Sequence, residues 1–252
     1  MSNVFGGVQK LGRALMLPVA VLPAAALLLR LGAGDVLDIP FIMKAGGAVF
    51  DNLALLFAIG VAIGLAFDNG GAAGLAGAVG YLTLTSAVVT INKDINMGVL
   101  AGMISGVSAG ILYNKYHDIR LPEWLGFFAG KRFVPIAASL VSIVLALLFG
   151  YIWPPVQSAI HNVGEWIVGA GALGAFAFGT LNRLLIPVGL HHVINSLVWF
   201  VFGNFTDAAG KVVTGDLSRF FAGDPTAGTF MTGFFPIMMF ALPAAAFAMY
   251  TT

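Results

Sequence analysis

Long apolar stretches alternate with short polar breaks along this chain. The gaps between charged residues divide it into about eight apolar segments. Several are shorter than the roughly 20 residues that a helix needs to cross a bilayer, which predicts helices that are broken or re-entrant. The segments are Ala14–Leu31, Ala45–Phe67, Ala72–Ile91, Met97–Tyr113, Phe133–Trp153, Gly169–Leu185, Leu190–Phe202 and Thr229–Tyr250.

Prolines support the expectation of broken helices. Each proline removes a backbone donor, and the carbonyl group it frees must be met by protein or by a water-filled cavity. A simple kink is the alternative at any one of these positions. The prolines concerned are Pro18, Pro23, Pro187, Pro236 and Pro243.

Composition agrees with a membrane protein. Hydrophobic residues make up 59% of the 252 residues, charged residues only 9%, and the mean hydropathy is +0.96. Soluble domains carry about 25% charged residues. The predicted fold class is therefore all-α, a polytopic membrane protein.

Several functions lose support from the sequence. A net charge of +1 gives no case for a nucleic-acid partner, and the lack of cysteine excludes disulfides, thiol catalysis and thiolate metal sites. The sequence contains none of the motifs of P-loop ATPases, serine hydrolases and zincins, so nothing in it supports those enzyme classes. We expect no cofactor, no metal site and no catalytic residue on this chain.

One short polar stretch, Asn182–Asn195, lies within apolar surroundings. It carries Arg183, His191 and His192. Arginine in hydrocarbon costs about 2.5–3.5 kcal/mol on insertion scales, so such residues usually face a cavity, a partner or a ligand. The stretch therefore marks where a membrane protein would handle a polar cargo.

The distribution of lysine and arginine predicts the orientation. The N-terminus, with Lys10 and Arg13, and the loop 115–132 hold more basic residues than the loops between them, so both are expected in the cytoplasm. The opposite loops hold Arg30, Lys44 and Lys93.

Two loops have a character of their own. Residues 121–128 are short, apolar and aromatic, which predicts an amphipathic helix on the membrane surface anchored by Trp124. Residues 204–225 are rich in glycine and charge, which predicts a hairpin-like loop whose charges are solvated. A cation site is the alternative there, but the spacing of its aspartates does not follow an EF-hand loop. Those aspartates are Asp207, Asp216 and Asp224.

Ordered motifs run along essentially the whole chain. They are Gly12–Pro23, Ala45–Asn52, Gly130–Ile136, Trp153–Pro155, Gly189–His192 and Gly223–Gly228. Together they resemble the membrane-embedded IIC component of the bacterial sugar phosphotransferase system, glucose superfamily. Asp51, Asn52 and the run Thr90–Leu100 are more similar to the N-acetylglucosamine permeases than to the glucose permeases.

The resemblance implies a function and partners. Such permeases sit in the bacterial inner membrane, bind a sugar and present it to a cysteine of the IIB domain, which donates the phosphoryl group. This chain has no cysteine, so its role would be binding and translocation. Family members are homodimers through their N-terminal half. The resemblance thus divides the chain into residues 1–130, for dimerisation and a cytoplasmic interfacial segment, and residues 131–252, the start of the sugar-binding half.

The resemblance also assigns residues to the sugar site. Arg183 and His191 match the family's sugar-binding positions, where a forked guanidinium and a neutral imidazole can bond sugar hydroxyls. On a helix, Asn195 would share the face of His191, four residues earlier. His192 would point about 100° away, so we expect it to be mainly structural. The candidate substrate-binding residues are Arg183, His191, Asn195 and His192.

Family members continue beyond the position of Thr252 to a Gly-Ile-Thr-Glu-Pro type motif, whose glutamate holds the hydroxyl that is phosphorylated. Glu123 and Glu165 lack that context. The chain is therefore expected to match the N-terminal two-thirds of a permease and to bind sugar weakly by itself.

Two alternatives stay open from the sequence: an ion-coupled secondary transporter, and a truncated homologue with an interaction or regulatory role. The choice between N-acetylglucosamine and glucose also stays open.

Overall fold

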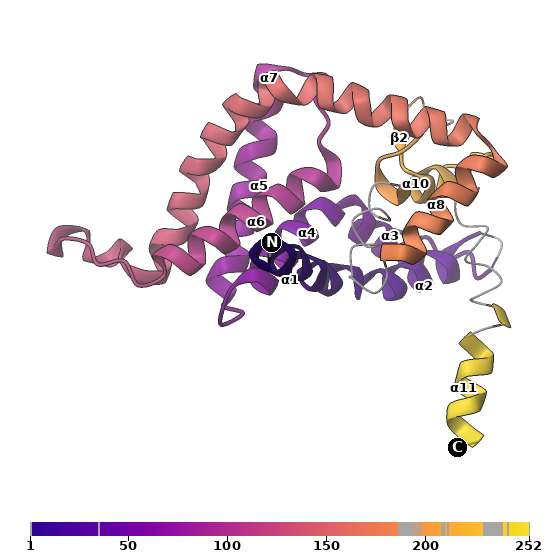
Figure 1. Ribbon diagram of the computed structural model, residues 1–252, viewed down its shortest axis with the longest axis horizontal. Coiled ribbons are helices and arrows are strands. Elements are labelled where there is room, and N and C mark those ends of the chain that lie inside the picture. The colour runs from indigo at the N-terminus through magenta and orange to yellow at the C-terminus, as the bar shows by residue number, and fades with distance from the viewer. Residues whose placement is uncertain are drawn as a thin grey trace. The chain divides into compact units, whose positions relative to one another are not determined.

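The computed structural model describes most of the chain, and helices dominate it (Figure 1). The chain forms two compact units, Met1–Gln157 and Ser158–Thr252. The division that the sequence suggested at residue 130 concerns function and stays a prediction. The described residues are 2–34, 36–185, 195, 198–207, 210, 212–228, 239–240 and 242–251.

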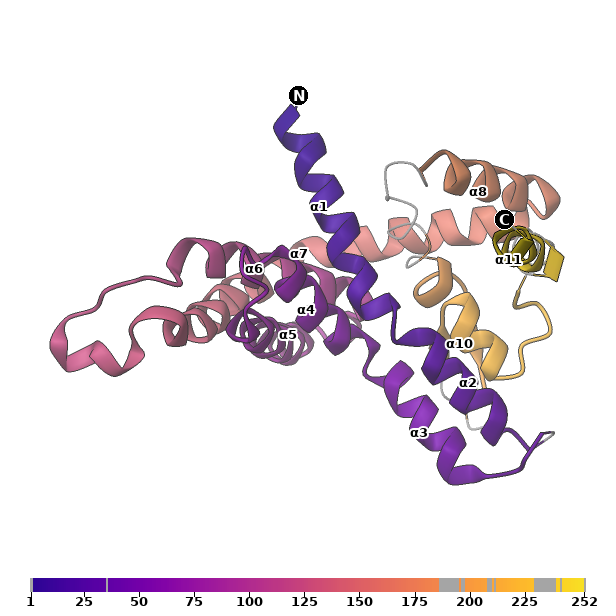
Figure 2. The same ribbon diagram turned by 90° about the horizontal axis from the view of Figure 1, so that it is seen from below.

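The first unit begins with two broken helices. The first break falls at Ala20 and Val21, just before Pro23, and the second at Asn52, where the two helices meet at 56°. In Figure 2, α2 lies beside α3, and α1 packs on α4. The predicted interruption of the first span by proline is confirmed. The helices are α1 (Ser2–Val19), α2 (Leu22–Gly32), α3 (Pro40–Asp51) and α4 (Leu53–Leu65).

Helix α6 (Gly98–Tyr116) lies at the centre of this unit, between α4 and α5 (Gly71–Ile91). Three glycines four residues apart on α6, Gly102, Gly106 and Gly110, face α4. A β-carbon at Gly106 would lie 2.8 Å from Val61 Cβ, and one at Gly110 would lie 2.8 Å from Leu65 Cβ. Small residues at this spacing let membrane helices pack backbone to backbone.

A short arm joins α6 to α7. It holds two 3₁₀ helices, η1 (Glu123–Phe128) and η2 (Gly130–Arg132). The expected amphipathic helix is therefore a single tight 3₁₀ segment, because Pro122 precedes it and Gly130 has a positive φ of 66°. Trp124 in this segment is 81% exposed, and its anchoring at a membrane surface stays a prediction.

Helix α7 (Phe133–Gly169) is longer than expected. The predicted end at Trp153 is wrong, because the helix continues through Pro154 and Pro155. Membrane helices tolerate proline when neighbouring groups satisfy the freed carbonyls. In the second half of α7, Gln157 accepts a hydrogen bond from the Asn96 amide at 3.0 Å and donates one to the Asp94 carbonyl at 3.1 Å.

The second unit combines helices with a β-hairpin. Strands β1 (Asn204–Thr206) and β2 (Val212–Thr214) pair antiparallel, with Phe205 opposite Val213. This confirms the hairpin-like loop predicted there. Only parts of the predicted segments Leu190–Phe202 and Thr229–Tyr250 lie within the described residues, namely 195, 198–202, 239–240 and 242–250. The helices of this unit are α8 (Ala172–Leu185), α10 (Asp216–Phe221) and α11 (Leu242–Thr251).

The described helices support fewer spans than the sequence predicted. Three helical stretches are long and apolar enough to cross a membrane: Gln9–Gly32, which runs through the break between α1 and α2, Gly71–Ile91, and Gly130–Ala159, which joins η2 to α7. The bent pair α3 and α4 makes up to four. The predicted number of about eight membrane segments is therefore not confirmed. Helix α6 is absent from this set, and because it is central, neighbouring helices can shield its polar Ser105 and its glycines from lipid.

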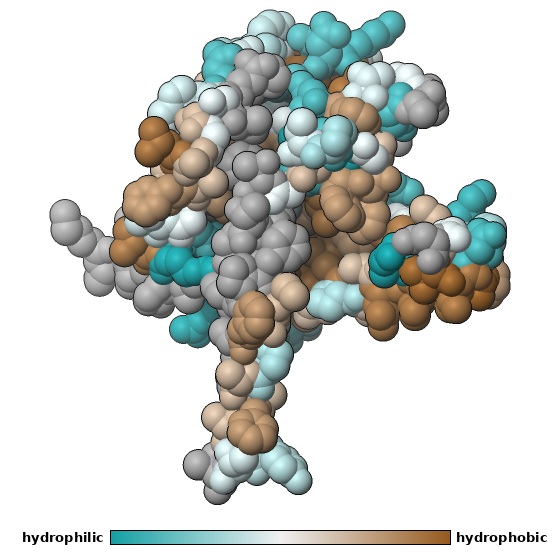
Figure 3. All heavy atoms as spheres, turned by 90° about the vertical axis from the view of Figure 1, so that its right-hand side faces the viewer, coloured by the Kyte–Doolittle hydropathy of each residue, from teal (hydrophilic) through white to brown (hydrophobic). Residues whose placement is uncertain are grey.

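Apolar side chains also cover much of the surface. Brown and tan apolar atoms lie at the surface in several places in Figure 3. Among the large exposed side chains are Phe41 on α3 and Leu140 and Val144 on α7. Exposed apolar helices of this kind are typical of a protein surrounded by lipid.

Candidate functional site

The polar stretch singled out in the sequence begins near the end of α8. Arg183 lies in the last turn of this helix and its side chain is exposed, whereas the preceding residue, Asn182, is buried. Asn195 is helical and buried. His191 and His192 lie outside the described residues, so the expected shared face of His191 and Asn195 stays a prediction.

A buried amide pair joins the two ends of this stretch. The Asn182 Nδ2 group donates a hydrogen bond to Asn195 Oδ1 across 13 positions of sequence. The other polar atom of the first side chain, Asn182 Oδ1, is buried and has no hydrogen-bond partner among the residues that the structure describes. A buried acceptor without a donor costs about 1–3 kcal/mol. The sequence expectation placed Asn195 toward a ligand, and the structure shows it bonded to Asn182.

A second buried polar cluster lies after the β-hairpin. Arg219 on α10 donates from Nε to Asp224 Oδ2 at 2.7 Å and from Nη2 to Thr226 Oγ1 at 2.7 Å. Asp224 also accepts hydrogen bonds from the amide and hydroxyl of Thr226 at 2.8 and 2.7 Å. The prediction that charges in this loop are solvated is therefore wrong for Asp216, Arg219 and Asp224, which are all buried.

These charges are buried because the turn after α10 brings the Asp224 carboxylate onto the Arg219 guanidinium. Burial raises the pKa of Asp224, but the hydrogen bonds from Thr226 and Arg219 outweigh it, so the pKa lies below its ordinary value. Burial raises the pKa of Asp216, whose Oδ1 accepts a bond from the Gly228 amide at 3.0 Å. Within the described residues no group of carboxylates and histidines could hold a metal ion, so the cation-site alternative gains no support.

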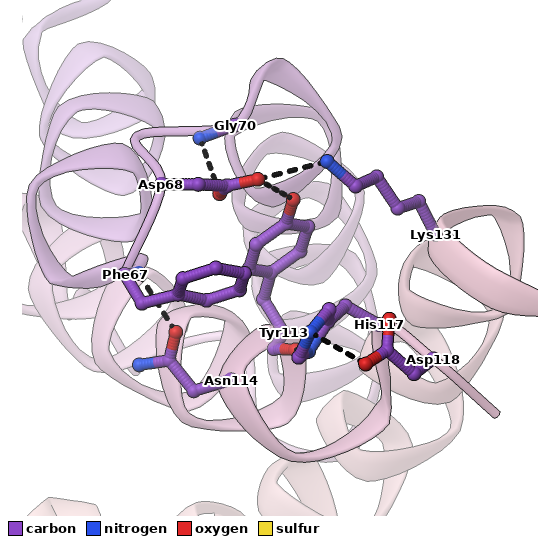
Figure 4. A network of polar contacts seen from close by, with 8 residues as sticks. All are labelled: Phe67, Asp68, Gly70, Tyr113, Asn114, His117, Asp118 and Lys131. Atoms are coloured by element: carbon purple, nitrogen blue, oxygen red, sulfur yellow. Dashed lines mark hydrogen bonds and ion pairs between the residues drawn. The ribbon is translucent and has the colours of Figure 1, made fainter.

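A third polar cluster closes one end of the first unit (Figure 4). Asp68 Oδ2 accepts hydrogen bonds from Lys131 Nζ at 2.8 Å and from the Tyr113 hydroxyl at 2.9 Å. The Gly70 amide donates to Asp68 Oδ1 at 3.0 Å. The bond from Lys131 is the main reason why the pKa of Asp68 lies below its ordinary value, and partial burial opposes it.

The same cluster stacks aromatic rings around a histidine. The ring of His117 lies 4.5 Å from the Phe67 ring and 5.7 Å from the Tyr113 ring, between centroids. The loop between α4 and α5 and the loop 117–132 therefore meet at one end of the unit. This arrangement agrees with the alternation of sides predicted from the spans.

Sequence reasoning missed several of these residues. Asp68 and Tyr113 were not singled out, and Asn182 was named only as the start of the polar stretch. The charges of Arg219 and Asp224 were assigned to solvent. An available signal was spacing: Arg219 and Asp224 lie five positions apart across a glycine, so a turn can bring them together. No comparable signal exists for Asp68 and Lys131, which are 63 positions apart.

Known proteins resemble this chain over nearly all of its length. Residues 12–252 match the model of the family described as Phosphotransferase system, EIIC. The N-acetylglucosamine-specific EIICBA component of Escherichia coli is 64% identical over 98% of this chain and 38% of that protein. The N-acetylglucosamine-specific EIICB component of Bacillus subtilis is 58% identical over 97% of this chain and 53% of that protein.

A relative with another printed specificity is less similar. The glucose-specific EIICBA component of Staphylococcus carnosus is 44% identical over 98% of this chain and 43% of that protein. The chain thus spans roughly two-fifths to a half of the length of these relatives. The family match covers the amide pair, the buried ion pair and the Asp68 cluster alike, and the chain belongs to the phosphotransferase system EIIC family of membrane permeases.

Proposed function

We propose that this chain is the membrane-embedded permease part of an N-acetylglucosamine phosphotransferase system. It binds the sugar, carries it across the cytoplasmic membrane and presents it to a IIB domain for phosphorylation. Its own sequence lacks cysteine, so the phosphoryl donor belongs to the IIB partner.

The choice of N-acetylglucosamine as the sugar is based on similarity to relatives whose names state a specificity. Proteins named for N-acetylglucosamine reach 64% and 58% identity, against 44% for a glucose-specific relative. The same ranking gives no support to an ion-coupled transporter or to a regulatory homologue. A glucosamine-specific component of Bacillus subtilis, at 51% identity, makes glucosamine the competitor to test first.

In this proposal Arg183 and His191 bind the sugar hydroxyls, with Asn195 and His192 close by. Arg183 supports the assignment because it begins a polar stretch at the end of an apolar helix. A guanidinium offers up to five fixed donors, and a neutral imidazole both donates and accepts. A sugar hydroxyl also donates and accepts, so the two side chains complement it.

The proposal extends to assembly and orientation. The permease is a homodimer in the inner membrane, with its N-terminus and the loop 115–132 in the cytoplasm. The basic and exposed aromatic residues of that loop, Trp124, Lys131 and Arg132, then lie on the side where IIB must dock.

Calorimetry on the complete permease in nanodiscs tests the sugar site. Arg183→Ala and His191→Ala each remove a proposed hydrogen-bond partner of the sugar, which weakens binding about tenfold to hundredfold. Arg183→Lys does not restore affinity, because one ammonium cannot replace the fork. Arg120→Ala is the matched control, since this exposed arginine lies in the first unit. Unchanged affinity in both site variants would refute the assignment.

Uptake into vesicles tests the function itself. With IIA, IIB and phosphoenolpyruvate present, N-acetylglucosamine should accumulate as its phosphate, and unlabelled N-acetylglucosamine should compete better than glucosamine or glucose. Accumulation of unmodified sugar without phosphoenolpyruvate would indicate an ion-coupled transporter instead.

A further inference from the structure

The buried amide pair occupies a particular place in the chain. Asn182 is 1% exposed and Asn195 is 5% exposed, so both side chains are enclosed by protein. They are 13 positions apart and are joined by a direct side-chain hydrogen bond. The chain therefore leaves one buried point after residue 182 and returns to the same point at residue 195.

Stability alone does not account for two amides at this position. Burying an amide removes its hydrogen bonds to water, and the bond from Asn182 Nδ2 to Asn195 Oδ1 compensates for only part of that loss. Within the described part of the chain, Asn182 Oδ1 has no partner, and a buried acceptor without a donor is destabilising. Two apolar side chains of the same shape would fill the space at less cost. What a bonded polar pair adds is a fixed register, because it disfavours every arrangement in which the amides separate.

These two amides stand at either end of the stretch of sequence that carries the expected sugar ligands. Arg183 directly follows Asn182, and His191 precedes Asn195 by four residues. We propose that Asn182 is a positioning residue of the sugar site, which acts by holding Asn195 and thereby both ends of the ligand-bearing stretch. The inference rests on the proposed function, and it assigns Asn195 to the support of the site rather than to sugar contact.

The test replaces the amides by near-isosteric leucine in the complete permease. Asn182→Leu leaves the Asn195 amide buried without its partner, so it lowers the unfolding temperature. The double variant Asn182→Leu with Asn195→Leu removes both amides and recovers the unfolding temperature. Both variants should bind N-acetylglucosamine at least about tenfold more weakly in calorimetry, a loss equivalent to about 1.4 kcal/mol. A merely structural pair would instead give wild-type affinity in the stable double variant.

A second readout is coupling to Arg183. If Asn182 acts by placing the ligands, Arg183→Ala should weaken sugar binding less in the Asn182→Leu background than in the wild type. The effects of mutations at residues that act together do not add. Full additivity would count against a positioning role. If the leucine variants do not fold, Asn182→Ser gives the same readout, because its short hydroxyl cannot span to Asn195.

Asn114→Leu is the matched control. Asn114 accepts a hydrogen bond from the Phe67 amide and donates one to the Leu65 carbonyl, both at 2.9 Å, within the first unit. Its loss should lower the unfolding temperature without changing sugar affinity. Wild-type protein that fails to bind N-acetylglucosamine overturns the proposed function together with this role. Normal binding by the wild type and by all Asn182 variants overturns the positioning role alone.

Discussion

The Lys131 ammonium lies 2.8 Å from the Asp68 carboxylate, although the two residues are 63 positions apart in the chain. Asp68 lies in the loop between α4 and α5, and Lys131 lies just before α7. The Tyr113 hydroxyl at the end of α6 bonds the same carboxylate oxygen (Figure 4). One acidic group thus joins three parts of the first unit at the end where its loops meet.

We expect Asp68→Asn to lower the unfolding temperature at neutral pH by a few degrees. The folded-state pKa of Asp68 is depressed from 3.8, chiefly by the bond from Lys131. Its contribution to stability is therefore present above about pH 4 and disappears as the pH falls through the lower folded value. Thermal unfolding in detergent at several pH values should show the gap between wild type and variant closing only in acid.

Asp118→Asn is the control for this experiment, because the Asp118 side chain is 84% exposed and its pair with His117 is weak in water. If the difference in unfolding temperature between the wild type and Asp68→Asn were the same at every pH, the electrostatic explanation would be contradicted.

Cysteine labelling tests the two ends of the first unit. The chain has no cysteine, so Asp118→Cys and Lys93→Cys each introduce a single reactive thiol. An impermeant thiol reagent on whole cells should label the variant at Lys93 and not the one at Asp118, and permeabilised cells should label both. The reverse pattern would invert the proposed orientation, and labelling of both from outside would contradict the fold.

Gly102→Ala should destabilise the protein by about 1–3 kcal/mol, as overpacking of a close helix contact does. A β-carbon at Gly102 would collide with the Ala54 carbonyl of α4. Gly179→Ala is the matched helical control, because beyond its own helix no described atom lies within 4 Å of the added carbon. It should be neutral or stabilise by about 0.5–1 kcal/mol, from helix propensity. Equal unfolding temperatures of the two variants would show that α4 and α6 are not in close contact.

Arg219→Ala should cost about 3–5 kcal/mol, because it leaves the buried Asp224 carboxylate without its guanidinium. The double variant Arg219→Met with Asp224→Leu removes both charges and should recover most of that loss. Thermal unfolding of the three proteins measures the difference. A single variant as stable as the wild type would mean that this pair is open to water.

Sequence predicted the helical membrane class because apolar composition and proline breaks are local properties. The hairpin was predictable too, since Gly210 and Gly215 adopt positive φ near its strands, and glycine marks such turns. The continuation of α7 through Pro154 and Pro155 could not be predicted from the sequence. A helix accepts proline when other groups satisfy the freed carbonyls, and those groups can be distant in sequence. Likewise, Asn195 was recognised as part of the polar stretch, but nothing local indicated that its partner is Asn182.

Polar contacts hold the chain at Lys131, just before α7, and again at Gln157 within α7. Roughly 26 residues separate these two contacts, or about 39 Å at 1.5 Å per residue. That length is close to the thickness of a bilayer including its headgroups, about 40–45 Å. The two contacts therefore define a preferred bilayer thickness. In a thicker or thinner bilayer, the helix must tilt or the two contacts are strained. Lipid chain length becomes a variable to which this permease should respond.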